Sequence, residues 1–324
     1  MICKSCVLPE SKPDIFLNEE GLCNICVDFN KRKADSGGHK LLESDLIGVL
    51  NKYRGKSKYD CLIMCSGGKD SVMSLYYMKK RYKLNPLVFT FDHGFENDTA
   101  MENIKNAVDI LKVDWLFYRT AFMKDIFALI IQNNPQVSIC HICAIWYIQL
   151  TYETAAKYKI PLIVAGWTKG QCDEGDDAGR VFAAMSKVTA DFITNNLHQM
   201  SQYKNFPRSI NEAIKKAQKK FKCQMISPHW YLQWEQDEIM EVLQNELNWK
   251  APQLSFPKGS TNCLMNFISV DLAMKHYGYT HYHIEMSKLI RLGRLSRQEA
   301  LNALRLDFDI NIINDILAKI KRSA

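Results

Sequence analysis

Cys65-Ser66-Gly67-Gly68-Lys69-Asp70-Ser71 is the segment of this sequence that decides the fold, and it joins an apolar run, residues 59–65, to a helical pattern, residues 71–82. Two adjacent glycines let the backbone turn sharply and bring its N–H groups close to an anion. The helix that begins there adds unpaired amides and the positive end of its dipole. Lys69 can neutralise phosphate charge, and Asp70 can support Mg²⁺ or cap the helix. The segment therefore predicts a phosphate-binding loop between a strand and a helix; the alternative is an ordinary Gly-Gly turn.

Short apolar runs alternate with longer helical patterns around this loop. Buried strands are expected at residues 59–65, 87–91, 114–118 and 161–165. Helices are expected at residues 71–82, 100–111, 121–132 and 144–158. After Gly175 the strands largely stop, and helical periodicity continues over residues 180–222 and 234–247. The alternation predicts an α/β fold, with a parallel sheet covered by helices on both faces and a helical C-terminal part.

Composition narrows the class of protein. The chain has 324 residues, of which 47% are hydrophobic and 24% charged, as in an ordinary globular protein of one large domain or two. It has neither an apolar run of about 18 residues nor a signal-peptide pattern, so we expect a cytoplasmic protein without membrane contact. The net charge of +7 favours anionic partners such as nucleotides or RNA. Eleven cysteines in that compartment favour metal or redox chemistry over disulfides.

The first four cysteines form two CxxC pairs that predict a metal site: Cys3, Cys6, Cys23 and Cys26. Their separation is that of a zinc ribbon, in which each pair binds one side of a tetrahedral Zn²⁺. An iron site is the main alternative. The metal would stabilise a module that is too small to have a core of its own. A polar stretch, residues 31–40, follows this module and is predicted to be a linker.

The string Ser-Gly-Gly-Lys-Asp-Ser resembles the SGGxDS signature of the PP-loop ATP pyrophosphatases. It is not a Walker A loop, because Asp70 stands where Ser or Thr is required. The resemblance implies an adenine-nucleotide α-hydrolase fold, cleavage of ATP to AMP and pyrophosphate, and catalytic roles for Lys69 and Asp70. The ATP-binding residues that it implies are Ser66, Gly67, Gly68, Lys69, Asp70, Ser71, Asp92, Gly166 and Thr168. His93, beside Asp92, is expected to be a structural residue of its loop.

A third CxxC, Cys140-His141-Ile142-Cys143, stands at the start of a helical pattern, so its thiols can point together. A distant cysteine would complete a metal site, with Cys263 as the first candidate and Cys223 as the second. This order resembles the iron–sulfur PP-loop thiolation enzymes. The resemblance implies that Cys140, Cys143 and Cys263 hold a [4Fe-4S] cluster whose remaining iron carries sulfur. The alternatives are buried thiols, or a zinc site that uses His141.

A second resemblance is carried by residues 3–10, 21–26 and 295–300, which are similar to the N-acetyl sugar amidotransferases. It implies conversion of a sugar acetamido group to an amidine, with ammonia supplied by a partner glutaminase. The middle of the chain departs from that family in its CxxC and distant cysteine, so sulfur transfer is favoured. Both resemblances imply the same first step, because transfer of AMP turns a carbonyl oxygen into a good leaving group.

We therefore predict three parts of the chain. Residues 1–40 are the zinc ribbon and linker, residues 41–175 the PP-loop ATP pyrophosphatase domain, and residues 176–324 a helical region that completes the active site. The favoured function is adenylation of a carbonyl oxygen followed by its replacement with sulfur. The alternatives are the amidotransferase and a nucleotide-binding zinc protein without turnover.

The sequence defines the cofactors, the substrate and the partner proteins less precisely than it defines the phosphate loop. ATP, Mg²⁺, Zn²⁺ and the [4Fe-4S] cluster are the expected cofactors. A small-molecule substrate is favoured over tRNA, because no separate RNA-binding domain is visible in the sequence. The second reactant would come from a sulfur donor or a glutaminase subunit, and a homodimer is compatible with the sequence.

Overall fold

The computed structural model describes residues 1–35, 41–172, 181–219, 221–232, 236–259, 263–306 and 308–321. The predicted boundary at Gly175 and most of the predicted linker lie outside these residues. The beginning of the linker is helical instead, because α1 (Asn24–Asp35) continues past Lys31. The first glycine of this stretch is Gly37, so nothing before it interrupts the helix.

Among the described residues, five parallel strands form the central sheet, in the order β3-β2-β1-β4-β5. Their bounds are β1 (Cys61–Met64), β2 (Pro86–Asp92), β3 (Asp114–Arg119), β4 (Leu162–Val164) and β5 (Gln224–Ile226). The first four lie at the predicted runs. The fifth was missed, because it begins with Gln224 and follows a lysine-rich stretch, whereas the equally short β4 is apolar throughout.

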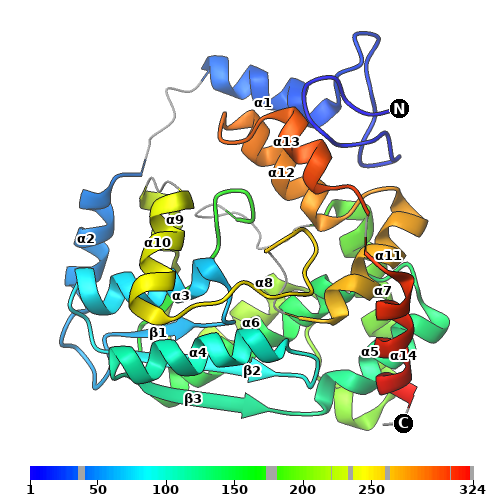
Figure 1. Cartoon of the computed structure of the whole chain (residues 1–324). Helices are drawn as coiled ribbons and strands as arrows, with labels where there is room; N and C mark the ends of the chain where they lie inside the picture. The colour runs from blue at the N-terminus through cyan, green and yellow to red at the C-terminus, as the bar shows by residue number, and fades with distance from the viewer. Residues whose placement is uncertain are drawn as a thin grey trace.

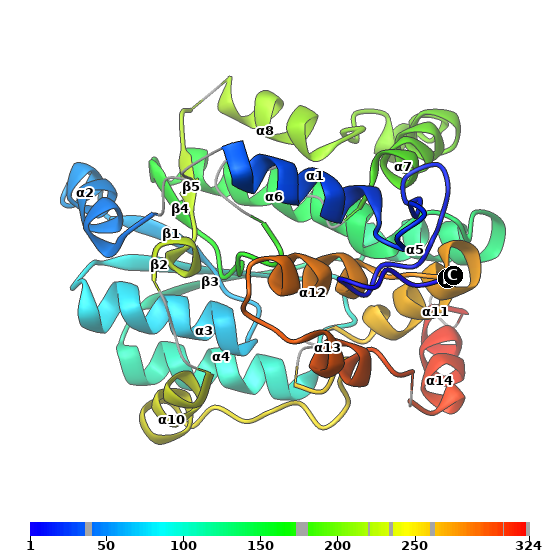
Figure 2. The same cartoon turned by 90° about the horizontal axis from the view of Figure 1, so that it is seen from above.

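Alternate residues of the strands pack against helices on opposite faces of the sheet. Leu62 and Phe89 belong to the cluster on one face, and their neighbours Ile63 and Val88 belong to the cluster on the other. The first face is covered by α5 (Phe122–Asn133), α6 (Ile139–Lys157) and α8 (Ile210–Gln218). The second is covered by α2 (Glu43–Tyr53), α3 (Lys69–Tyr76), α4 (Asp98–Leu111) and α10 (Gln236–Leu247). Figure 2 shows the sheet between these two sets, which confirms the predicted α/β fold.

Short helices connect these layers. The π-helix η1 (Tyr77–Arg81) continues α3, so together they span the helix predicted at residues 71–82. On the other face, α7 (Ala183–Asn195) leads through η2 (Leu197–Gln199) and η3 (Ser201–Tyr203) to α8. The single turn α9 (Pro228–Tyr231) follows β5 directly.

The C-terminal part is helical, as predicted. It contains α11 (Met265–Tyr277), α12 (His281–Arg291), α13 (Arg297–Ala303) and α14 (Ile310–Lys321). A capping box begins α13: Glu299 N donates to Ser296 Oγ at 3.2 Å, and Ser296 N donates to Glu299 Oε2 at 2.9 Å. Figure 1 shows α14 beside α5 and α11. Within the described part of the chain, no helix combines the length and apolar character needed to cross a bilayer.

The N-terminal module is docked on the C-terminal helices. Its four cysteines, Leu8 and Ile15 form a small buried cluster with Met185 of α7 and Tyr279, just before α12. The guanidinium of Arg297 donates to the carbonyl oxygens of Cys3 and Cys6, at 3.0–3.2 Å. In Figure 1 the blue N-terminal segment lies beside the orange α12 and α13. The N-terminal module therefore packs directly on helices from the C-terminal part of the chain.

Candidate functional site

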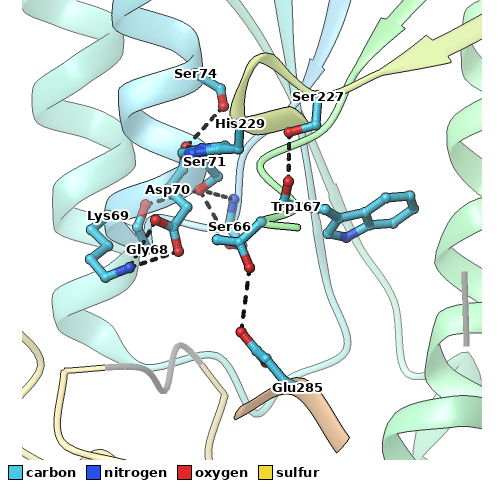
Figure 3. Close-up of polar contacts among 11 residues, drawn as sticks. Ser66, Gly68, Lys69, Asp70, Ser71, Ser74, Trp167, Ser227, His229 and Glu285 are labelled. Carbon is cyan, nitrogen blue, oxygen red and sulfur yellow. Dashed lines mark hydrogen bonds and ion pairs between the residues drawn. The ribbon is translucent and has the colours of Figure 1, made fainter. Parts of the chain in front are cut away.

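The predicted phosphate loop lies between β1 and α3, and its own hydroxyls hold it in shape. Ser66 N donates to Ser71 Oγ at 3.2 Å, and Ser71 Oγ donates to Gly68 O at 3.0 Å (Figure 3). Ser71 is buried, so its hydroxyl braces the loop. Ser66 is exposed and lines the cavity described below. Of the two serines, Ser66 is therefore the one whose side chain can reach a ligand.

The turn at Gly67 is fixed by neighbouring elements. Its φ is +78°, in the left-handed region, and a Cβ there would lie 2.0 Å from the carbonyl oxygen of Ala100 in α4. Its own carbonyl oxygen accepts from Trp249 Nε1 at 2.9 Å and from Asn103 Nδ2 at 3.2 Å. Trp249 and Asn103 were not identified from the sequence, since neither belongs to a recognisable motif.

Lys69 and Asp70, the predicted catalytic pair, form an ion pair with each other. Lys69 Nζ lies 2.8 Å and 2.9 Å from the two carboxylate oxygens of Asp70 (Figure 3). Both side chains are partly buried at the start of α3, where the helix dipole favours an anion. Phosphate oxygens can replace the carboxylate as acceptors for Lys69, which would leave Asp70 able to face a metal ion.

His229 supports this turn from the end of β5. Its ring nitrogen Nε2 donates to the carbonyl oxygen of Asp70 at 3.0 Å. Burial lowers the pKa of His229, so the ring is neutral at pH 7 and its Nε2 carries the proton for this bond. His229 was not singled out from the sequence. The strand before it was missed, so its place at a carboxyl end of the sheet was not visible.

Changing Lys69 to methionine should weaken binding of MgATP by about 10- to 100-fold, because a charge-assisted hydrogen bond contributes about 1.5–3 kcal/mol. Isothermal titration calorimetry with MgATP measures the change. Lys275→Met is the matched control: Lys275 also pairs with an aspartate, Asp271, at 2.7 Å, but on the surface. Unchanged MgATP affinity in Lys69→Met would contradict the assigned role.

The remaining predicted ATP contacts have structural partners of their own. Asp92 accepts from Gly94 N at 2.5 Å and lies 3.3 Å from Arg119 Nε, so its carboxylate holds the loop after β2. A Cβ on Gly166 would lie 2.6 Å from the Cα of Ser71, so this glycine lets the loop after β4 approach α3. Thr168 Oγ1 lies 3.5 Å from Glu285 Oε1 of α12. Their contact with ATP stays a prediction.

A cavity of about 250 Å³ extends from the phosphate loop to the three predicted cluster ligands. Its lining includes Ser66, Cys140, Cys143 and Cys263. Cys140 and Cys143 lie in the first turn of α6, whose N-cap Ser138 accepts from His141 N. The fold thus brings together cysteines that are more than a hundred residues apart in the sequence. Cys223, the second candidate, lies elsewhere, in the core beside Ile160.

The environment of these thiols favours their neutral form. Burial, and then the nearby Cys140 and Glu96, raise the pKa of Cys143 well above its usual range. Burial and then Glu96 and the other two thiols do the same for Cys263. Three thiolates together in such a place require a cation, because buried charges are stable only when they are paired or bound to a metal. The donor set therefore fits a metal group.

His93 and Glu96 also lie in this cavity, although the sequence analysis assigned His93 only a structural role. His93 Nε2 lies 3.3 Å from Glu96 Oε1 and 3.5 Å from Cys263 Sγ. Burial lowers the pKa of His93 to about 4 and raises that of Glu96 well above its usual range. In the sequence, only their place directly after β2 pointed to a role in binding, since ligands of open α/β sheets bind at the carboxyl ends of the strands.

The four N-terminal thiols converge as the spacing predicts. All four are buried, and their sulfur atoms lie within 4.8 Å of one another. The Cys6 and Cys23 sulfurs are 3.7 Å apart. This matches the edge of a tetrahedron with Zn–S bonds of about 2.3 Å, which is about 3.8 Å long. Backbone N–H groups of Cys23 and Cys26 point at the sulfurs of Cys3 and Cys23. The site thus fits a structural Zn²⁺.

Comparisons with known proteins give distant similarities. No family model matches the chain. An uncharacterised protein of Methanocaldococcus jannaschii is 24% identical over 306 residues, which cover 94% of this chain and 93% of that protein.

The similar solved structures include three enzymes. The U34-tRNA thiolase NcsA from Methanococcus maripaludis with its [4Fe-4S] cluster is 17% identical over 91% of this chain and 88% of that chain, with a TM-score of 0.37. The NH3-dependent NAD synthetase from Campylobacter jejuni is 15% identical over 86% of this chain and 92% of that chain, with a TM-score of 0.39. The NMN synthetase from Francisella tularensis is 11% identical over 80% of this chain and 88% of that chain, with a TM-score of 0.39. At these low scores, function has to be inferred from the residues of this chain.

Proposed function

We propose that this protein is a PP-loop ATP pyrophosphatase that adenylates a carbonyl oxygen of its substrate and then replaces that oxygen with sulfur. The observation that carries the proposal is the shared cavity. Ser66 of the phosphate loop lines it together with Cys140, Cys143 and Cys263. A substrate atom in this cavity can therefore meet both the α-phosphate of ATP and a metal group on the thiols.

In the first step the substrate's carbonyl oxygen attacks the α-phosphorus of ATP. A new C–O–P linkage forms, the bond between the α-phosphorus and the bridging oxygen breaks, and pyrophosphate leaves. The backbone N–H groups of Gly68 and Lys69 and the dipole of α3 would stabilise the phosphate charge, with Lys69 as the mobile cation. Since Trp249 and Asn103 already fix the turn, little reorganisation is needed when ATP binds.

In the second step sulfur takes the place of the adenylated oxygen, and AMP leaves. A [4Fe-4S] cluster bound by Cys140, Cys143 and Cys263 would supply the sulfur from its remaining iron. The cavity wall provides Phe91, Tyr147 and Trp167 to exclude water from the reacting carbon. No lysine or arginine is found among the described residues that line it. That favours a neutral reacting group such as an amide or a lactam, on a small molecule or on tRNA.

The decisive experiment is the metal content of protein purified without oxygen. We expect a brown protein with iron and acid-labile sulfide, which Cys140→Ala, Cys143→Ala and Cys263→Ala each lose. Cys223→Ala is the control, because that thiol is buried and lies outside the cavity. Each variant should still bind MgATP, because the cysteines are not part of the phosphate loop. A colourless wild-type protein that contains only zinc would contradict sulfur transfer.

A second candidate is the N-acetyl sugar amidotransferase, with ammonia from a partner glutaminase. One observation favours it: two of the stretches that carry the resemblance are in contact, through the bonds from Arg297 to Cys3 and Cys6. Pyrophosphate release from iron-free protein with ammonia and an acetamido sugar would support this candidate. Nucleotide binding without pyrophosphate release would instead support a zinc protein without turnover.

A further inference from the structure

His93, Glu96 and Cys263 converge at one point of the cavity wall. His93 follows β2, and Glu96 comes three residues later. Cys263 is held against Glu96 by a backbone bridge, in which Leu264 N donates to Phe95 O at 2.8 Å. The Nε2 atom of His93, a carboxylate oxygen of Glu96 and the sulfur of Cys263 lie within 4.8 Å of one another. Imidazole, carboxylate and thiolate are all zinc ligands.

The distances match a single bound ion. Zinc bonds of about 2.1 Å to N and O and about 2.3 Å to S give tetrahedral edges of about 3.4 Å for N···O and about 3.6 Å for N···S. The observed distances from His93 Nε2 are 3.3 Å to the Glu96 oxygen and 3.5 Å to the Cys263 sulfur. Hydrogen bonding accounts for only one of the two contacts, because a ring nitrogen carries a single proton.

The other ring nitrogen of His93, Nδ1, lies on the opposite side of the imidazole from these two contacts. His93 is 2% exposed, and its Nδ1 atom has no hydrogen-bond partner among the residues that the structure describes. A bound water would satisfy it, since native proteins keep few buried polar atoms without a partner and a ligating His usually donates through its second nitrogen. His141, which the sequence suggested as a zinc ligand, lines the same cavity but does not belong to this cluster.

We propose that His93, Glu96 and Cys263 bind one divalent zinc ion, with a fourth position open to the cavity. Three protein ligands and one open position are the arrangement of a catalytic zinc, which polarises a carbonyl oxygen as a Lewis acid. This site goes beyond the proposed sulfur transfer and does not need Cys140 or Cys143. Because both ligand sets contain Cys263, the zinc ion and the cluster exclude each other. The metal that is loaded would then decide whether the cavity can deliver sulfur.

The test uses the full chain, prepared without oxygen and without metal, and titrated with Zn²⁺ and with Co²⁺. We expect two ions per chain, one in the N-terminal module and one here. The isosteric change Glu96→Gln and the change His93→Gln should each lower the affinity for the second ion by at least about 100-fold. Cys140→Ala and Cys143→Ala should leave its affinity unchanged. The visible absorption of bound Co²⁺ distinguishes the two sites, since the N-terminal site has four thiolate ligands and the cavity site has one.

Reconstitution of the same variants with iron and sulfide provides the converse measurement. Cys140→Ala and Cys143→Ala should lose the cluster, whereas Glu96→Gln and His93→Gln should keep it. A variant is folded if it keeps the ion in the N-terminal module and unfolds at the same temperature as the wild type. The zinc proposal is overturned by a wild-type protein that binds only one ion, or by loss of the second ion in Cys140→Ala. Failure of sulfur transfer would appear separately, as absence of a cluster in the wild type.

Discussion

Replacing Gly67 with alanine is expected to weaken binding of MgATP by about 100-fold or more, because the loss of two charge-assisted hydrogen bonds of about 1.5 kcal/mol each already costs about that factor. The residue has a φ of +78°, and the added Cβ would lie 2.0 Å from the carbonyl oxygen of Ala100. Backbone cannot move aside as a flexible side chain can, so the loop itself must shift. Its N–H groups would then no longer converge on the phosphates. Isothermal titration calorimetry with MgATP measures the loss.

Gly55→Ala is the matched control for this change. Gly55 also has a positive φ, +70°, but no atom lies within 4 Å of the position that a Cβ would occupy. We expect it to lose about 1–2 kcal/mol of stability from the left-handed conformation alone. Its MgATP affinity should be that of the wild type. If Gly67→Ala binds MgATP as tightly as Gly55→Ala does, the turn at Gly67 does not form the phosphate site.

Cys26→Ser should release the N-terminal metal and unfold the module that surrounds it. Half of the buried residues of its cluster are the four cysteines themselves, so little apolar core remains without the ion. Structural zinc contributes about 10–16 kcal/mol to the folding of zinc-finger peptides, far more than this cluster can replace. Zinc content and hydrogen exchange over residues 1–35 measure the effect. We expect one zinc fewer per chain and loss of protection throughout the module.

The control for this prediction is Cys61→Ala, which removes a fully buried thiol in β1. It creates a small cavity in the core but should leave the zinc content and the protection of residues 1–35 unchanged. Cys26→Ser protein that keeps its zinc and its protection would show that three thiolates and another ligand suffice. In that case the module would not depend on the complete four-thiolate set.

Most of the architecture could be predicted from the sequence, whereas only some of the residues that line the cavity could be. Four strands were visible as apolar runs, and the loop at Ser66 was visible because its glycines and its context are local features. β5 was not visible, because Gln224 and the lysines before it break up its short apolar run. The sequence predicted only a loop role for His93 and none for Glu96, because Cys263 approaches them only through the fold. Contacts of that range leave no pattern in a single sequence, whereas CxxC pairs and capping boxes do.

The bonds from Arg297 to Cys3 and Cys6 also set an order of events during synthesis. These partners are separated by up to 294 residues, so at about 5–20 residues per second the arginine leaves the ribosome about 15 to 60 s after the first cysteine. The four thiols can capture zinc early, yet α12 and α13, on which the module rests, are translated late. Until then its apolar side is open to chaperones. A stop codon before α11 would remove Tyr279, α12 and α13 and leave only the α7 part of that cover, and such a fragment is expected to be degraded.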